Sequence, residues 1–169
     1  MTTKHSLLLV DGNPYVSGIL VQSLKASFNV TVANTGQEAV RLLMQGNRFD
    51  CVLTELQLPQ LSGLELTRFI RTSRLLKHIP IVVLSNASDS DTRINCLEQG
   101  VDSYIAKPFN PLEVKAKLTA LLRRAPSPVE ETQHAFVPAR PQLESKPLWQ
   151  PKSRILSMIL KRYTVLQRM

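Results

Sequence analysis

Four polar side chains lie at the ends of four short apolar runs of the sequence. They are Asp11, Glu55, Ser85 and Lys107. Glu55 is the most informative of them, because a carboxylate at the tip of a buried strand is costly unless it is paired or used. If the apolar runs are parallel strands of one sheet, their carboxyl ends meet at the same edge. Ligands of open α/β sheets bind at that edge, so the sequence predicts a functional site there.

Five apolar runs are predicted to be the strands that position these side chains. Several of them are apolar throughout, which is typical of strands that are covered on both faces. The predicted strands are Ser6–Val10, Val30–Ala33, Cys51–Thr54, Ile79–Leu84 and Ser103–Ala106.

Amphipathic segments separate the strands, and apolar residues recur in them at helical spacing. Pro14 suits the first turn of a helix, Thr35 with Glu38 resembles a capping box, and Gly100 is a typical helix terminator. The predicted helices are residues 14–27, a segment that starts after Thr35, a segment that starts at 62–63, and residues 89–99 and 111–124. A strand and then a helix thus occur five times, which predicts an α/β fold: an open five-stranded parallel sheet with helices on both faces.

The composition favours a folded domain and excludes several classes of protein. Hydrophobic residues make up 43% of the 169 residues, which is enough to build a core. No apolar run is long enough for a transmembrane helix, and the apolar stretch before Asp11 is too short for a signal peptide. We therefore expect a cytoplasmic protein, with Cys51 and Cys96 as free buried thiols.

The last quarter of the chain differs from the rest in composition. Residues 125–151 hold six of the eleven prolines and are predicted to be an extended linker, whereas residues 152–169 are predicted to be a basic amphipathic helix. We therefore divide the chain into a domain at 1–124, this linker and this helix. The candidate contact residues of the tail are Trp149, Lys152, Arg154, Lys161, Arg162 and Arg168. They suit an acidic partner, nucleic acid or an anionic membrane surface, although a solvated basic terminus has the same composition.

Over residues 5–124 the sequence resembles the receiver domain of two-component response regulators. The segments that carry the resemblance are LLLVDGNP, FDCVLTELQLPQLSGLEL, IPIVVLSNAS and GVDSYIAKPFNPLEV. The resemblance implies a flavodoxin-like (βα)5 fold that accepts a phosphoryl group on an aspartate with the help of Mg²⁺. In such a reaction the acceptor carboxylate is the nucleophile, and the metal ion needs several oxygen ligands.

The resemblance also assigns roles to residues of this chain. Asp11 matches the first member of an acidic pair that helps to hold the metal ion. Ser85 matches a hydroxyl residue that bonds the phosphoryl group, and Lys107, followed by Pro108, matches a lysine that neutralises it. Tyr104 matches an aromatic residue that moves with the switch.

Three positions depart from the family pattern. Gly12 replaces the second acidic residue, Asn13 follows it where Glu is common, and Glu55 replaces the aspartate acceptor. The carboxylate of Glu55 lies about 1.5 Å farther out than that of aspartate, and an in-line displacement tolerates this poorly. Without a carboxylate at Gly12, Mg²⁺ is expected to bind weakly or not at all. The sequence therefore predicts an atypical receiver, of the pseudo-receiver type, that uses no cofactor.

Two interpretations of Glu55 are open at this point. In the first, Glu55 mimics a phosphorylated aspartate by accepting a hydrogen bond from Ser85 and pairing with Lys107. In the second, Glu55 and Lys107 form a structural ion pair that stabilises little, because desolvation offsets the attraction. A third possibility, conventional phosphorylation, would require tight Mg²⁺ binding.

The predicted function is that of an atypical receiver in bacterial phosphorelay-type signal transduction, which acts by protein–protein contact and is not an enzyme. The expected contact surface is residues 89–124, the C-terminal helix, or both, and the partner is another protein or a second copy of the chain. The alternative is a regulator whose basic tail binds nucleic acid or an anionic membrane with steep salt dependence. The histidines show no spacing typical of a metal site.

Overall fold

The computed structural model of the chain describes residues 4–87 and 89–124. The predicted linker at 125–151 and the predicted basic helix at 152–169 lie outside the described residues. The candidate contact residues of the tail therefore lie outside them too. No helix within the described residues is long and apolar enough to cross a membrane.

Five strands alternate with five helices along the described part of the chain. The strands are β1 (His5–Val10), β2 (Phe28–Ala33), β3 (Cys51–Glu55), β4 (Ile81–Ser85) and β5 (Ser103–Ala106). The helices are α1 (Pro14–Leu24), α2 (Gly36–Met44), α3 (Gly63–Thr72), α4 (Ser90–Glu98) and α5 (Pro111–Arg124).

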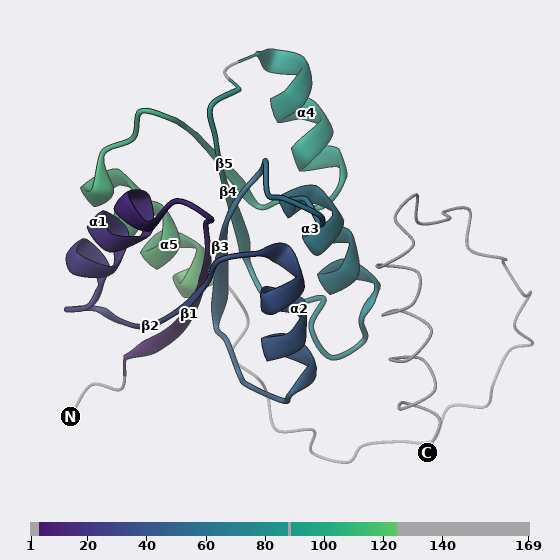
Figure 1. The fold of residues 1–169 in the computed structure, drawn as a ribbon, viewed down its shortest axis with the longest axis horizontal. Coiled ribbons are helices and arrows are strands. Elements are labelled where there is room, and N and C mark those ends of the chain that lie inside the picture. Colours follow the sequence, from purple (N-terminus) through teal and green to yellow (C-terminus); the bar gives the residue numbers. More distant parts are fainter. Residues whose placement is uncertain (1–3, 88, 125–169) are drawn as a thin grey trace, which may run out of the picture. The chain divides into compact units, whose positions relative to one another are not determined.

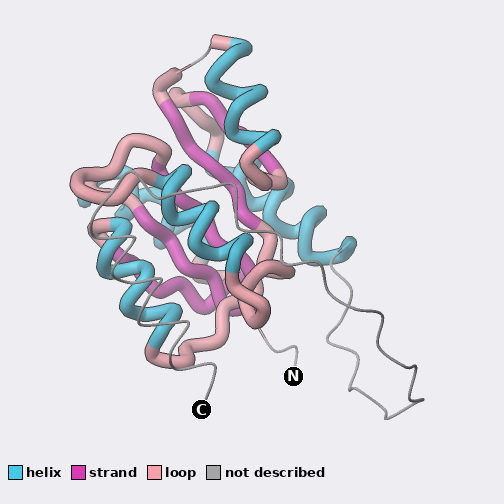
Figure 2. Tube along the Cα trace, turned by 90° about the vertical axis from the view of Figure 1, so that its right-hand side faces the viewer, coloured by secondary structure: helices cyan, strands magenta, loops and turns pink. Residues whose placement is uncertain are grey.

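The strands form one parallel sheet in the order β2-β1-β3-β4-β5. Helices α1 and α5 cover one face of the sheet, and α2, α3 and α4 cover the other (Figure 1). Figure 2 shows the strands as a layer between these helices. The predicted flavodoxin-like α/β fold, with helices on both faces of an open parallel sheet, is confirmed. Because the strand order reverses between β1 and β3, the loops after these two strands diverge and leave room for a site.

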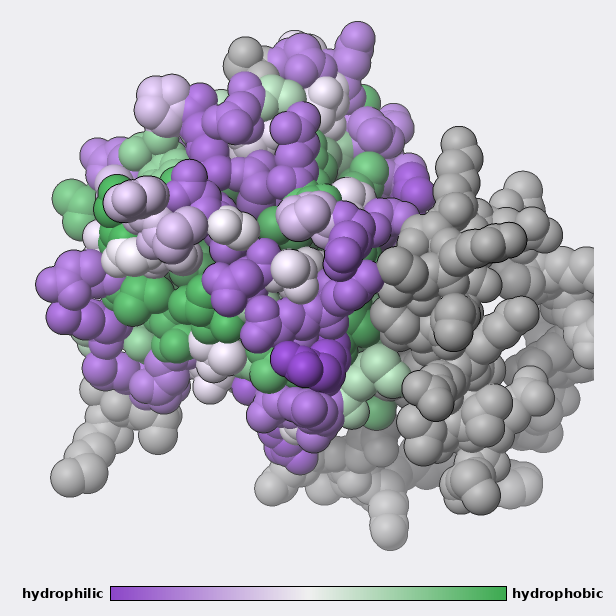
Figure 3. All heavy atoms as spheres, viewed as in Figure 1, coloured by the Kyte–Doolittle hydropathy of each residue, from purple (hydrophilic) through white to green (hydrophobic). Residues whose placement is uncertain are grey.

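The core explains why several strands are apolar throughout. Strands β3 and β4 are buried along their whole length, since helices lie on both of their faces. Leu53 and Leu84 pack toward α1 and α5, whereas Val83 packs with Cys96 of α4 on the opposite face. On the face shown in Figure 3, hydrophobic residues gather over the region of α1, α5 and the neighbouring sheet edge, and hydrophilic residues cover α2.

Several element boundaries differ from the predicted ones for identifiable reasons. Strand β4 begins at Ile81 rather than at residue 79, because Pro80 has no N–H to donate to a neighbouring strand. Strand β2 begins earlier, at Phe28, whose side chain is buried in the core and whose backbone pairs with β1. Strands β3 and β4 extend through Glu55 and Ser85, so these polar side chains belong to the strands themselves.

The connection between β3 and α3 passes very close to the end of β3. Gly63 opens α3, and its N–H donates to the Leu56 carbonyl at 2.9 Å. A Cβ atom added at Gly63 would lie 2.2 Å from the carbonyl oxygen of Glu55. Ser62 and Glu65 fix the start of the helix with a capping box. A glycine at this position therefore lets the helix approach the residue that occupies the predicted acceptor position.

We expect Gly63→Ala to lower the free energy of unfolding by about 1–3 kcal/mol, because the backbone of β3 or α3 must move to admit the methyl group. The matched control is Gly18→Ala in α1, where an added Cβ meets nothing within 4 Å. This control should raise the free energy of unfolding by about 0.5–1 kcal/mol through helix propensity. Urea unfolding measures both changes. An unchanged midpoint for Gly63→Ala would contradict the close approach.

Candidate functional site

Asp11 is placed at the sheet edge by the end of β1. The residue is 2% exposed, and its N–H donates to the Ala33 carbonyl at 3.1 Å. Its Oδ1 accepts a hydrogen bond from the Asn13 N–H at 2.7 Å. Asn13 in turn caps α1 by accepting from the N–H groups of Tyr15 and Val16 at 3.0 and 3.4 Å. The loop after β1 is thus fixed by one carboxylate and one capping amide.

Glu55 ends β3 with a side chain that turns back onto its own backbone. The residue is 6% exposed. Its Oε1 accepts hydrogen bonds from the N–H groups of Leu56 and Gln57 at 2.9 and 3.3 Å. Its Oε2 lies against the ammonium group of Lys107. Both oxygens of the carboxylate therefore have donors within the protein.

Lys107 connects the two carboxylates. It follows β5, and its N–H donates to the Ser85 carbonyl at 2.7 Å, while a cis peptide bond joins it to Pro108. Its Nζ contacts Glu55 Oε2 and lies 3.4 Å from Asp11 Oδ2. Burial lowers the pKa of Lys107, but the hydrogen bond and charge of Glu55, together with Asp11, outweigh this and raise the pKa above its usual value. The ammonium group is therefore charged at neutral pH.

Ser85 and Tyr104 each form a hydrogen bond with the backbone of Ala87. The hydroxyl of Ser85, which is fully buried, accepts a hydrogen bond from the Ala87 N–H at 3.1 Å. The half-buried Tyr104 donates its hydroxyl to the Ala87 carbonyl. Among the described residues there is no hydrogen bond between Ser85 and Glu55. The mimicry interpretation expected Glu55 to contact both Lys107 and Ser85, and the structure contains only the first of these contacts.

Sequence reasoning missed two features of this site. It did not single out Ala87, because that residue contributes only its backbone N–H and carbonyl, and every residue other than proline carries the same groups. It also paired Lys107 with Glu55 alone, whereas the structure adds Asp11 as a second partner. The signal for this contact was present, since all three residues were predicted to lie at the same edge of the sheet.

The pocket holds two buried carboxylates and one ammonium group. Each of the four carboxylate oxygens of Asp11 and Glu55 already accepts a hydrogen bond from a protein group, and two of them face the same ammonium. Gly12 supplies no third carboxylate, and the described residues contain no group of three or more acidic, histidine or cysteine side chains that could hold a metal ion. Mg²⁺ requires a near-octahedral set of oxygen ligands. A dication would have to compete with Lys107 for both carboxylates.

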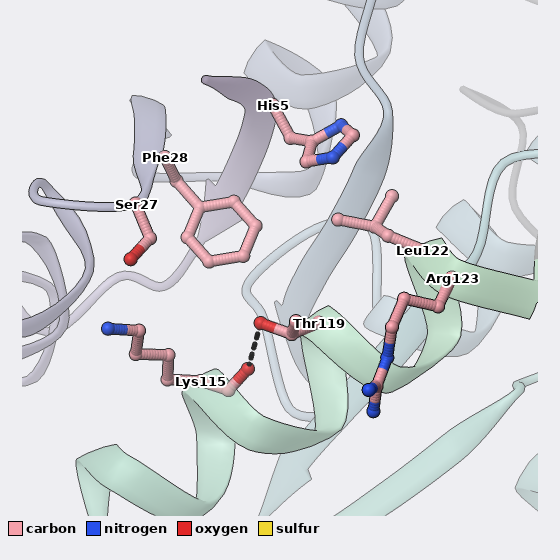
Figure 4. Close-up of a pocket in the computed structure, with 7 residues that line it drawn as sticks. All are labelled: His5, Ser27, Phe28, Lys115, Thr119, Leu122 and Arg123. Atoms are coloured by element: carbon pink, nitrogen blue, oxygen red, sulfur yellow. Dashed lines mark hydrogen bonds between the residues drawn. The ribbon is translucent and has the colours of Figure 1, made fainter. Parts of the chain in front are cut away.

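A hollow of about 380 Å³ lies at the opposite end of the strands (Figure 4). Its lining comes from the first residues of β1 and β2 and from α5, and includes His5, Phe28 and Lys115. The hydroxyl of Thr119 donates to the Lys115 carbonyl at 2.9 Å, as the dashed line shows. None of the predicted site residues lies in this hollow. The candidate site is therefore the edge formed by the carboxyl ends of the strands.

Comparison with known proteins places the chain in a sequence family. The model of a family described as "Response regulator receiver domain" matches residues 7–119. Transcriptional regulatory protein SrrA of Staphylococcus aureus is 35% identical over 129 residues, which make up 76% of this chain and 52% of SrrA. The chain thus spans about half the length of the curated relatives it matches.

Solved structures show the same similarity. A putative response regulator from Chloroflexus aurantiacus has a TM-score of 0.68 and 32% identity, over 72% of this chain and 100% of that protein. The receiver domain of the sensor histidine kinase PA1611 from Pseudomonas aeruginosa has a TM-score of 0.65 and 31% identity, over 72% and 99% of the two chains. That domain is described with a magnesium ion coordinated in its active-site cleft.

We expect Glu55→Gln to lower the free energy of unfolding by about 1–3 kcal/mol, because it removes a charged partner of a largely buried ammonium. The pKa of Lys107 should fall in this variant, since burial is then opposed mainly by Asp11. An NMR titration of the Lys107 side chain and urea unfolding measure the two effects. The matched control is Glu113→Gln, which removes an exposed partner of Lys117 at 3.0 Å and should change stability by less than about 0.5 kcal/mol.

The same pair predicts a pH dependence. The pKa of Lys107 is raised above 10.5 in the folded protein, so its contribution to stability is fully present below that pH. The contribution is lost as the pH rises through the folded pKa. The stability difference between wild type and Glu55→Gln should therefore stay constant from about pH 7 to 9 and shrink only in more alkaline solution. A difference that shrinks already across this neutral range would contradict the assignment.

Proposed function

Because the chain belongs to the response-regulator receiver family, we propose that it is a two-component signalling module whose pocket is held in one state by Lys107 instead of being switched by phosphorylation. The observation that carries this proposal is the position of the Lys107 ammonium, which contacts both Glu55 and Asp11. A contact that is built into the chain needs no phosphoryl group to form it. The module is then a constitutive adaptor, an atypical receiver of the pseudo-receiver type.

The geometry of Glu55 supports the view that it is a poor acceptor. A nucleophilic carboxylate needs an oxygen that can reach phosphorus in line with the leaving group. One oxygen of Glu55 accepts two backbone hydrogen bonds at the end of β3, and the other lies against Lys107. An attack would require at least one of these contacts to break, in a pocket where Gly12 provides no carboxylate.

We further propose that this pocket works without Mg²⁺. The PA1611 receiver domain, which is 31% identical to this chain, is described with magnesium coordinated in its cleft. In this chain the carboxylate oxygens of Asp11 and Glu55 are already bonded to protein donors. The second acidic position is a glycine, and this difference supports the proposal.

The output of the module, in this proposal, is contact with a protein partner through residues 89–124. Two apolar side chains of α4, Ile94 and Leu97, are 51% and 47% exposed. A hollow of about 320 Å³ is lined by residues of α4, β5 and α5, among them Arg93, Tyr104 and Lys117. Because Tyr104 donates to the Ala87 carbonyl, the same residue touches both the site loop and this surface. A pocket in one fixed state would then hold the surface in one arrangement.

The chain acts as a binding module and not as an enzyme, and it works in the cytoplasm with a protein partner or a second copy of itself. SrrA is a transcriptional regulatory protein, but this chain spans only about half of it. Binding of nucleic acid or a membrane surface by the basic tail stays a prediction, because that segment lies outside the described residues.

The test is incubation with a small-molecule phosphodonor and Mg²⁺, followed by intact mass measurement. We expect no phosphoryl mass on wild type and one phosphoryl group on Glu55→Asp combined with Gly12→Asp, which restores the family's acceptor and acidic pair. Gly12 is exposed, and an added Cβ lies 3.3 Å from the Asn34 carbonyl oxygen, so a small shift admits the new side chain. The matched control is Glu113→Asp, a surface change that should leave wild-type behaviour intact.

Two results would contradict the proposal. The first is labelling of wild type that is lost in Glu55→Gln, because Glu55 would then be a working acceptor. The second is a double variant that stays unlabelled although its circular dichroism and unfolding midpoint match those of wild type. In that case the two departures at Gly12 and Glu55 would not be what prevents phosphorylation.

A further inference from the structure

We propose that Lys107 is the resident cation of this pocket and takes the charge-balancing place that a divalent metal ion would otherwise fill. This inference rests on the proposed function and deepens it, since it names what keeps the pocket in one state. It concerns only the described residues Asp11, Glu55 and Lys107.

The pocket holds two buried negative charges. Asp11 and Glu55 are 2% and 6% exposed; Asp11 directly follows β1 and Glu55 ends β3, and these strands are neighbours in the sheet. Two buried carboxylates at one edge repel each other and lose hydration, so they require a cation nearby. In the described part of the chain, the only cationic side chain paired with either carboxylate is that of Lys107.

The ammonium group of Lys107 is paired with both carboxylates. It contacts one oxygen from each carboxylate, so a single positive charge is shared by both. The other oxygen of each carboxylate accepts a hydrogen bond from a backbone N–H. These backbone bonds hold each carboxylate with its remaining oxygen toward the ammonium. Each of the four carboxylate oxygens thus has a hydrogen-bond donor, either a backbone N–H or the Lys107 ammonium.

Mg²⁺ and the Lys107 ammonium would compete for the same two carboxylates. The fold delivers Lys107 to the pocket, because its N–H is bonded to the Ser85 carbonyl and its side chain is only 14% exposed. A free Mg²⁺ ion must shed tightly held water and then either displace the ammonium or bind beside it. Binding beside it places like charges in contact, and displacement leaves a largely buried ammonium without a partner. The pocket should therefore reject the ion while Lys107 is charged.

The experiment compares melting temperatures in EDTA and in about 10 mM MgCl₂, with ionic strength matched by NaCl. Wild type should shift by less than about 1 °C. Lys107→Met should melt at a lower temperature in EDTA and gain about 3 °C or more from Mg²⁺, because the bare carboxylates then bind the ion. Adding Glu55→Gln to Lys107→Met should abolish the gain. Lys77→Met, at an exposed lysine without an ion pair among the described residues, should behave as wild type.

The proposal is overturned if Mg²⁺ raises the melting temperature of wild type as much as that of Lys107→Met, or if Lys107→Met gains nothing. If Lys107→Met does not fold, titration of Mn²⁺ against wild type and Lys107→Gln by electron paramagnetic resonance decides between the same outcomes. Neither readout involves a phosphoryl group. Labelling of wild type by a phosphodonor would therefore refute the proposed function without changing the cation result, and a metal-binding wild type that stays unlabelled would refute only the present inference.

Discussion

The site depends on one electrostatic constraint, the need of two buried carboxylates for a shared positive charge. The pairing of β1 with β3 ends with Val10 opposite Thr54 and so brings the next residues, Asp11 and Glu55, to the same edge of the sheet. The long side chain of Lys107 reaches them from beyond β4. The strand order thus decides which charges meet, and the loop conformations follow from satisfying them.

The backbone has as large a part in the pocket as the side chains do. Amide groups hold one oxygen of each carboxylate, and the backbone of Ala87 receives Tyr104 and supplies the N–H that Ser85 accepts. The close passage of Gly63 past the Glu55 carbonyl fixes the other side of the same edge. Tyr104 is bonded to Ala87 in the loop after β4 and also lines the hollow formed with α4 and α5.

The sequence predicted the fold well because its main signals are local. Continuous apolar runs identify buried strands, and Pro, Gly and capping residues mark the helix ends. The edge residues were predicted for the same reason, since each follows or ends such a run. The contact of Lys107 with Asp11 and the bond of Tyr104 to Ala87 are not local, because they depend on side-chain reach and on backbone groups that any residue carries. For the same reason, the absence of a Ser85–Glu55 hydrogen bond among the described residues could not be read from residue types.

The ammonium group of Lys107 is part of the chain, so every newly made molecule contains it. In the proposed function no covalent mark distinguishes one copy of the protein from another, so each copy presents the same surface from the moment it folds. The signal then depends on the number of copies in the cell and on competition between partners for one surface. Such a module would be controlled through its synthesis and degradation, because the amount of protein in the cell would carry the signal.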